Sequence, residues 1–416
     1  MVCSQAAGCG CPGHARPFMK EYHIGVMSIL GQIGGQLEQI GELTARAASV
    51  IRRGGAVWTS MNIGHLAPHE QSETRGGSPR IMNDHGDYYT VDFSKPRKGD
   101  MVFTNFCDRA VQAARDRGAY VVAVTTNYIN NEFRPAGVTI PNEDNLLLRD
   151  VSSEILHSHV PYSNGLVHAP QIPELTLCPS SAIGHAALHW MLNAGLAHRL
   201  AKGHALAGAT GAQYLNILME RISGIGEHED RIRETAVSMT RRIQSGGCWH
   251  VRSLEHPGLA SELDYVECGP RIVNRLGDWN LRKEENVLLI NAISPAYPDE
   301  VRLAAEEQSR GALVIVIAPA AMDGMVPCTR LIDSADISFD NYSPESGGVI
   351  RIEGRSGTIC PTSGIAGNVI QQMICAQWTD EMIRRGLVPS FFMGMRQQGG
   401  TQYNRKLQPL AEKQGY

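Results

Sequence analysis

The chain has 416 residues, of which 43% are hydrophobic and 19% charged, and a formal net charge of −4. A weakly negative chain without a basic stripe has no general attraction for nucleic acid or anionic membranes. The longest apolar runs, such as ALVIVIAPAAM at 312–322, are shorter than the ~20 residues that a membrane-spanning helix needs. No signal-type apolar stretch opens the chain. We therefore expect a cytoplasmic protein with a small-molecule ligand and no nucleic-acid or membrane partner.

Residues 1–17 form a cysteine-rich segment that we expect to be a disordered tail. Its Cys3, Cys9, Cys11 and His14 have a spacing that matches no standard zinc pattern, although metal binding remains an alternative. The ten cysteines of the chain are interpreted as reduced thiols, because no secretion signal accompanies them.

From residue 18 onward the sequence repeats once, with a period of roughly 185–190 residues. Apolar residues at helical spacing fill 22–55 and stop at a Gly pair, and the same pattern fills 213–247 and stops at a second Gly pair. Arginines precede both pairs, as is typical of a helix C-terminus. The pattern predicts a long helix at the start of each copy.

Each Gly pair is followed by the same alternation of apolar strands and helices. Strands are predicted at 56–61, 100–106 and 120–127 in the first copy and at 248–253, 286–294 and 313–320 in the second, with helices at 109–118 and 299–311. Short apolar strands that alternate with helices indicate a parallel sheet covered on both faces. The fold class is therefore α/β, with two tandem doubly wound units of about five strands that bind ligands at the C-terminal strand ends.

The small, Gly-rich segment 201–212 is the predicted linker, which gives domains 18–205 and 206–416. Each copy then closes on a Cys-Pro turn into a last amphipathic helix, CPSSAIGH at 178–185 and CPTSGIAG at 360–367. The hydroxyls in these turns could cap the helices, and free N–H groups at a helix N-terminus also favour anions.

These elements resemble a tandem pair of SIS (sugar isomerase) domains. The tail GLVPSFFMGMRQQGGTQYNRKL at 386–407 is similar to the C-terminal signature of a poorly characterised single-SIS family, in which PPVF precedes DGGDxxN. The resemblance covers residues 18–416 and implies flavodoxin-like domains that usually pair. It therefore also implies a homo-oligomer, a dimer or a tetramer.

In SIS domains the loop after the first strand often reads GTGHS and leads into a helix that carries a catalytic glutamate. The resemblance places His256 and Glu262 of LEHPGLASEL at these positions in the second copy, and His65 and Glu70 of NIGHLAPHE in the first. A carboxylate and an imidazole suit the proton transfers of aldose–ketose isomerisation through an enediol. Alternatively, each histidine is a hydrogen-bonding residue at a helix entry and each glutamate a solvated first-turn residue.

The sequence departs from the SIS pattern where a loop of SxSGxT type usually holds phosphate. The second copy has NAISPAYPDE at 291–300, and the first has TNFCDRA at 104–110. The ligand is then a neutral sugar, a cyclitol or another polar carbonyl compound, unless arginines and the hydroxyls of the last turn hold a phosphate. The predicted substrate-binding residues are Ser180, Ser181, Ser294, Arg355, Thr362, Ser363 and Arg396.

A metal site is a second hypothesis for the first copy. His65 and His69 are four residues apart and would share one face of a helix with Glu70 beside them, although Pro68 makes a regular helix less secure. Some SIS heptose isomerases use a divalent metal near this loop, and imidazole ligands favour zinc. Histidines in 157–168 could complete such a site. The enediol chemistry itself requires no cofactor.

The leading functional hypothesis is an isomerase of a sugar or sugar phosphate with its sites at the interface between SIS units. Elimination or deamination of an amino sugar begins with the same proton abstraction and is an alternative. A non-catalytic, sugar-binding regulatory protein is another, although no helix-turn-helix segment accompanies the two units.

Overall fold

The computed structural model describes residues 16–61, 66–72, 75–84, 95–105, 109–125, 148–202, 207–264, 269–274, 285–320, 329–344, 347–394 and 399–414. The cysteine-rich segment with its candidate metal ligands therefore lies outside the described residues. The cysteines inside these ranges, Cys178, Cys248, Cys360 and Cys375, form no disulfide.

The first unit is a five-stranded parallel sheet with helices around it. In chain order its elements are α1 (Phe18–Gly34), α2 (Leu37–Arg52), β1 (Val57–Ser60), α3 (Leu66–Gln71), β2 (Asn83–Asp84), β3 (Met101–Thr104), α4 (Arg109–Asp116), β4 (Tyr120–Thr125), α6 (Leu148–Val151), β5 (Glu154–His157), β6 (Gly165–His168), β7 (Thr176–Pro179) and α7 (Ser181–Lys202). The strand order is β2-β1-β3-β4-β5, with every pair parallel.

The second unit repeats this order. Its elements are α8 (Ala207–Ile225), the 3₁₀ turn η1 (Gly226–His228), α9 (Glu229–Gln244), β8 (Trp249–Arg252), α10 (Pro257–Asp264), β9 (Val273–Asn274), β10 (Val287–Asn291), α11 (Pro298–Ser309), β11 (Leu313–Ala318), the 3₁₀ turn η2 (Leu331–Ser334), β12 (Ile337–Asp340), β13 (Ile350–Arg351), β14 (Thr358–Ile359), α12 (Ser363–Arg384) and α13 (Gly400–Gln414). Its sheet runs β9-β8-β10-β11-β12, also in parallel. Both sheets have the flavodoxin-like 2-1-3-4-5 order.

The central strands are buried on both faces, which explains their continuous apolar sequence. Every residue of β3, β10 and β11 is buried. The predicted doubly wound architecture is therefore confirmed in both units.

The start of each unit differs from the single long helix that the sequence predicts. Residues 22–55 form two helices, α1 and α2, which are separated at Gly35 and Gln36. The second unit has the same division, with the turn η1 between α8 and α9. The predicted helix ends are confirmed, because Gly54 and Gly246 follow the second helices with φ of 80° and 92°, a left-handed conformation that suits glycine.

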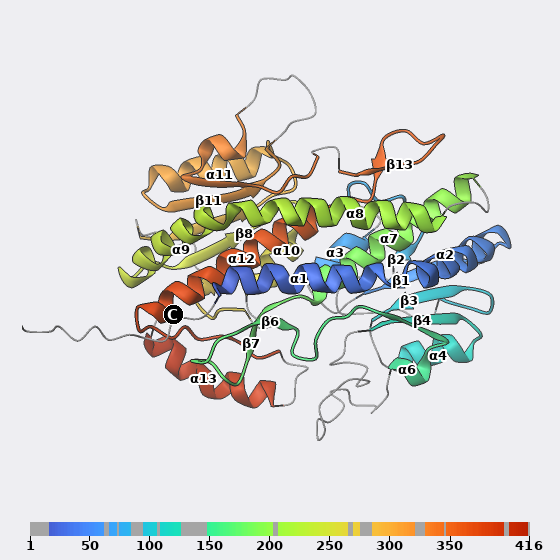
Figure 1. The fold of residues 1–416 in the computed structure, drawn as a ribbon, viewed down its shortest axis with the longest axis horizontal. Coiled ribbons are helices and arrows are strands. Elements are labelled where there is room, and N and C mark those ends of the chain that lie inside the picture. The colour runs from blue at the N-terminus through green and yellow to red at the C-terminus, as the bar shows by residue number, and fades with distance from the viewer. Residues whose placement is uncertain are drawn as a thin grey trace, which may run out of the picture.

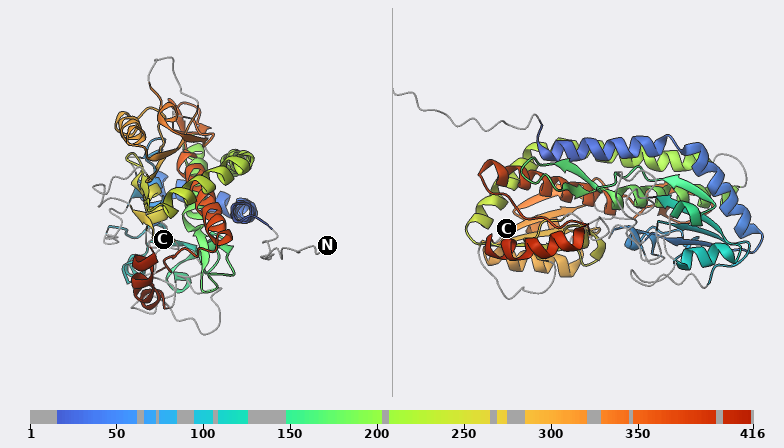
Figure 2. Two further views of the ribbon diagram at one scale, coloured as in Figure 1. Left: turned by 90° about the vertical axis from the view of Figure 1, so that its left-hand side faces the viewer. Right: turned by 90° about the horizontal axis from the view of Figure 1, so that it is seen from below.

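The first helices of the two units are exchanged between them. Helix α1 packs chiefly against α12 of the second unit, while α8 packs chiefly against α7 of the first. Figure 1 shows α1, α8 and α12 running lengthwise through the molecule, and the right-hand view of Figure 2 shows the two sheets side by side beneath them. One hydrophobic cluster consequently includes core residues of both units. The predicted limit at 205 and 206 stays a prediction, because 203–206 lie outside the described residues.

An antiparallel hairpin that the sequence analysis missed precedes each last helix, β6–β7 in the first unit and β13–β14 in the second. Both hairpins lead into the Cys-Pro turns, where Cys178 and Cys360 have the same φ of 61°. Tyr22 Oη donates to the carbonyl oxygen of Pro179 at 3.0 Å, and Tyr214 Oη donates to that of Pro361 at 2.9 Å. The repeated Cys-Pro sequence thus marks one backbone turn built twice, anchored each time by a tyrosine of the first helix.

Candidate functional site

Helices α3 and α10, each of which follows the first central strand of its unit, meet at the junction between the units. Three of the predicted catalytic residues, Glu70, His256 and Glu262, lie on or beside these helices and are buried. Glu262 reaches across the junction, where its Oε1 accepts a hydrogen bond from the backbone N–H of Leu66 at 2.8 Å. The fourth, His65, lies outside the described residues.

The Glu70 carboxylate is the centre of this junction, and both of its oxygens have partners. His256 Nε2 lies 2.8 Å and Arg75 Nε 3.3 Å from Oε1. Trp190 Nε1 donates to Oε2 at 2.6 Å. We call these four residues, Glu70, Arg75, Trp190 and His256, the junction cluster. It joins three segments of the first unit to the β8–α10 turn of the second.

Electrostatics keep Glu70 ionised. Burial by itself raises the pKa of the carboxyl group, but the Arg75 charge and the hydrogen bonds from His256 and Trp190 outweigh it and lower the pKa from 4.5 to about 2. An ionised carboxylate only accepts hydrogen bonds, so Nε2 of His256 carries the proton between the two groups. Glu70 therefore holds the imidazole in one orientation.

The other ring nitrogen of His256, Nδ1, is buried and has no hydrogen-bond partner among the described residues. The half-buried ring of His69 lies nearby, with 5.5 Å between the ring centroids. Burial lowers the pKa of His69 to about 4, with a further lowering from His256, so His69 is neutral at physiological pH. The site thus offers two imidazoles beside one fixed carboxylate.

The hydroxyls of the last turns do not cap their helices as the sequence suggested. Thr362 is the N-cap residue of α12 but makes no capping hydrogen bond through its side chain. Its Oγ1 instead accepts a hydrogen bond from Arg221 and lies 3.0 Å from Ser343 Oγ. Ser363 Oγ accepts from Arg75 Nη2 at 2.9 Å. The second-unit hydroxyls therefore contact guanidinium groups.

In the first unit an amide takes the capping position. Asn164 Oδ1 accepts the backbone N–H groups of Ser180 and Ser181, at 3.1 Å and 2.8 Å. Ser180 Oγ donates to the Asn164 carbonyl oxygen, whereas Ser181 Oγ is buried without a hydrogen-bond partner in the described part of the chain.

Two further predicted substrate-binding residues, Ser294 and Arg355, form hydrogen bonds with residues outside the junction cluster. The backbone N–H of Ser294 donates to Glu255 Oε2 at 2.9 Å. Arg355 Nη2 donates to the carbonyl oxygen of Pro79 at 2.8 Å. Arg396 lies outside the described residues. These hydrogen bonds of Ser294 and Arg355 thus lie outside the junction cluster, and the predicted substrate-binding set as a whole stays a prediction.

The predicted metal set of His65, His69 and Glu70 cannot be assembled from the described residues, because His65 is not among them. Within the described ranges, no group of three or more His, Cys, Asp or Glu side chains is arranged to hold a metal ion. His168 of the 157–168 segment points to Glu21, with Nδ1 at 3.0 Å from Oε1. The metal hypothesis stays a prediction.

Sequence reasoning missed Arg75, Trp190 and Arg221, which contact the predicted residues directly. Trp190 lies in the predicted last helix of the first unit, and neither it nor the two arginines belong to a motif. Arg221 lies seven residues after Tyr214 on α8, but the repeat gives no signal for it, because α1 has Ile29 seven residues after Tyr22.

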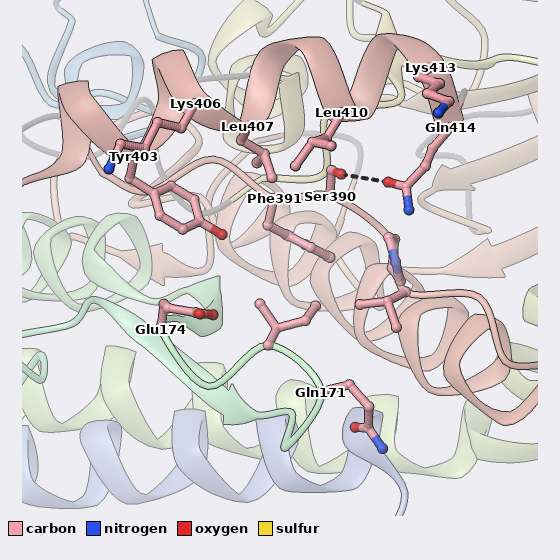
Figure 3. Close-up of a pocket in the computed structure, with 13 residues that line it drawn as sticks. Gln171, Glu174, Ser390, Phe391, Tyr403, Lys406, Leu407, Leu410, Lys413 and Gln414 are labelled. Atoms are coloured by element: carbon pink, nitrogen blue, oxygen red, sulfur yellow. Dashed lines mark hydrogen bonds between the residues drawn. The ribbon is translucent and has the colours of Figure 1, made fainter.

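A separate pocket of about 680 Å³ lies between α13, the 388–391 segment and the 171–174 turn. Figure 3 shows Tyr403, Leu407 and Leu410 of the helix facing Phe391 across it, with Glu174 and Gln171 on the opposite side. None of the predicted site residues that fall within the described ranges lines this pocket. In the described residues, no helix is both long and apolar enough to span a bilayer.

Comparisons with known proteins place the chain near one sequence group and one fold. No family model matches it. A UPF0309 protein of Geobacillus thermodenitrificans is 20% identical over 229 residues, which are 47% of this chain and 92% of that protein. A UPF0309 protein of another Geobacillus strain is 26% identical over 230 residues, 47% of this chain and 93% of that protein.

Among solved structures, a proposed phosphosugar isomerase of Clostridium difficile has the same fold along nearly its whole length. Its TM-score is 0.53 at 11% sequence identity, and the alignment covers 90% of this chain and 95% of that one. This likeness supports the fold predicted from the repeat. It does not transfer an activity.

Proposed function

We propose that this chain, which carries two units of the SIS (sugar isomerase) fold, is an isomerase of a sugar or sugar derivative that acts at the junction between its units. The observation that carries the proposal is the Glu70–His256 pair. A carboxylate of one unit holds an imidazole of the other by one nitrogen, at 2.8 Å, and leaves the second nitrogen without a partner among the described residues.

Aldose–ketose isomerisation needs a base that moves a proton between neighbouring carbons through an enediol, and a group that carries protons to the oxygens. In the neutral ring, a proton on Nε2 leaves the lone pair on Nδ1, so His256 has the tautomer of a base oriented by a carboxylate. His69, neutral and adjacent, suits the proton transfers to the oxygens. Both assignments are proposals.

The role proposed for Glu70 is not that of the catalytic base, which its sequence position suggested. Its pKa of about 2 and its three hydrogen-bonding partners make it a poor proton acceptor at neutral pH. We propose that it positions His256. Glu262, whose Oε1 accepts the N–H of Leu66, would likewise position α3.

One observation favours a second candidate function. Glu70 and His256 are each only 1% exposed, so the pair could serve solely to join the units of a non-catalytic, sugar-binding protein. The amino-sugar elimination and deamination reactions begin with the same proton abstraction and need the same base. The cytoplasmic location stays a prediction. Assembly into a dimer or tetramer also stays a prediction, and light scattering coupled to size-exclusion chromatography would measure the molar mass that decides it.

Solvent exchange tests the proposal without knowledge of the substrate. The purified protein is incubated in D₂O with neutral aldoses, ketoses, amino sugars and their phosphates, and loss of the carbon-bound proton beside the carbonyl is followed by NMR. We expect exchange on at least one compound, and a loss of about 10²-fold or more in His256→Gln. The exposed His168→Asn is the control. Binding without exchange would support the non-catalytic candidate, and unchanged exchange in His256→Gln would refute the assignment.

A further inference from the structure

Two backbone N–H groups at the C-terminal strand ends of the second unit are already bonded to glutamate side chains of the same unit. Ser294 follows β10, and its N–H donates to Glu255 Oε2 at 2.9 Å. Leu254 follows β8, and its N–H donates to Glu300 Oε1 at 2.6 Å. Unpaired N–H groups at such strand ends and helix entries are the groups that bind phosphate and other anions. At Ser294 the chain itself supplies the acceptor, the side chain of Glu255.

A second carboxyl group, that of Glu300, lies beside this loop. Glu300 is fully buried in the first turn of α11, and its Oε2 has no hydrogen-bond partner among the described residues. Burial, with the nearby Glu255 charge adding to it, raises the pKa of Glu300 to about 8. A phosphate would have to displace Glu255 and would then face a second carboxyl group.

The adjoining pocket, of about 220 Å³, is better suited to hydroxyl groups. Ser253 and Ser261 line it together with Arg252 and apolar side chains, and the Ser253 hydroxyl is buried without a hydrogen-bond partner in the described ranges. A buried hydroxyl can donate to and accept from a ligand hydroxyl at no charge cost. The hydroxyl groups of the pocket therefore suit a small polyhydroxyl molecule, with Arg252 as a charged side chain in the lining.

We propose that Glu255 is a specificity-determining residue that occupies the anion position of the second unit, so that this unit admits an uncharged polyhydroxyl ligand and excludes a phosphate ester. This inference rests on the proposed function in one respect: it takes a sugar-type molecule as the natural ligand of the pocket. The excluded group, phosphate, can be tested directly.

The test measures melting temperature against inorganic phosphate at constant ionic strength, with chloride as the reference salt. The wild type is compared with Glu255→Ser, which frees the Ser294 N–H, and with Glu255→Gln, which keeps the shape and removes the charge. We expect Glu255→Ser to gain a saturable rise on the order of a few °C over the wild type. The exposed Glu306→Gln, on the same unit, should behave as the wild type.

Equal phosphate dependence in the wild type and Glu255→Ser, or no phosphate effect in either, would overturn the proposal. Circular dichroism checks that Glu255→Ser folds, and if it does not, a gain in Glu255→Gln decides the question. Because the readout is phosphate binding, absence of isomerase activity would refute the proposed function and leave this inference standing. Conversely, isomerase activity without any gain of phosphate binding in the Glu255 variants would refute this inference and leave the proposed function standing.

Discussion

His256 Nε2 lies 2.8 Å from Glu70 Oε1, although the two residues are 186 positions apart. Glu70 belongs to the first unit and His256 to the second, so this buried hydrogen bond joins the two units. Arg75 and Trp190 complete the hydrogen bonding of the carboxylate. A buried charge that is paired in this way is stabilised only as long as every partner remains.

The first prediction concerns the strength of this tie. Glu70→Gln should lower the free energy of unfolding by about 3–5 kcal/mol, because the Arg75 guanidinium would stay buried without its counter-charge. Urea denaturation measures the change. Glu306→Gln is the control, since its exposed pair with Arg310, at 3.9 Å, should contribute less than about 1 kcal/mol. Equal effects of the two substitutions would contradict a structural role for Glu70.

The same carboxylate predicts a pH dependence. The pKa of Glu70 is about 2 in the folded protein and 4.5 ordinarily, so the unfolded chain binds the proton more tightly. The stability that the ionised form contributes is complete above pH 4.5 and is lost as pH falls towards 2. Unfolding free energies measured across this window should fall more steeply for the wild type than for Glu70→Gln. Parallel profiles would show that the ionised carboxylate does not stabilise the fold.

A substitution at Gly364 tests how closely α12 packs against the junction cluster. A Cβ atom on Gly364 would lie 1.9 Å from Glu70 Oε1, and that oxygen is held by two other side chains. Gly364→Ala should therefore destabilise the protein by about 1–3 kcal/mol. Gly31→Ala is the matched control, because it lies in helix α1 with nothing within 4 Å of its Cβ and should stabilise by up to about 1 kcal/mol. Thermal unfolding that ranks the two variants in reverse would contradict this packing.

Glu300 predicts a pH effect of opposite sign. Its pKa is raised from 4.5 to about 8, so the folded protein holds the proton more tightly than the unfolded chain. Relative to Glu300→Gln, the wild type should lose stability as pH rises from 4.5 to 8 and should then level off. Each unit of pKa corresponds to about 1.4 kcal/mol, so the loss should reach a few kcal/mol. A constant difference between the two proteins across this range would show that Glu300 ionises normally.

Much of the fold could be predicted from local pattern. The strands β1, β3, β4, β8, β10 and β11 and the helices α4 and α11 lie where apolar periodicity predicted them, because these segments are short, strongly patterned and end at turn residues. The division of the first helices and the hairpins before the Cys-Pro turns were missed. Both features depend on packing between segments that are distant in sequence. For example, a Cβ atom on Gly25 of α1 would lie 3.0 Å from the side chain of Leu166 in β6.

The site was only partly predictable for the same reason. The repeat and the resemblance selected Glu70, His256 and Glu262, and the structure brings them to one junction. The sequence alone assigned them similar catalytic parts, because residue type and spacing carry no information on burial or partners. Burial, Arg75 and Trp190 decide that Glu70 stays ionised and positions the histidine.

By itself, the sequence determined that the chain is two copies of one parallel α/β unit, since alternating strand and helix patterns are local and survive duplication. The tertiary structure alone decided that the copies exchange their first helices, and that a carboxylate of one unit meets an imidazole of the other. It also decided that the second unit's strand-end N–H groups are taken by its own glutamates. Those relationships depend on distances between residues far apart in the chain, which only the packed fold sets.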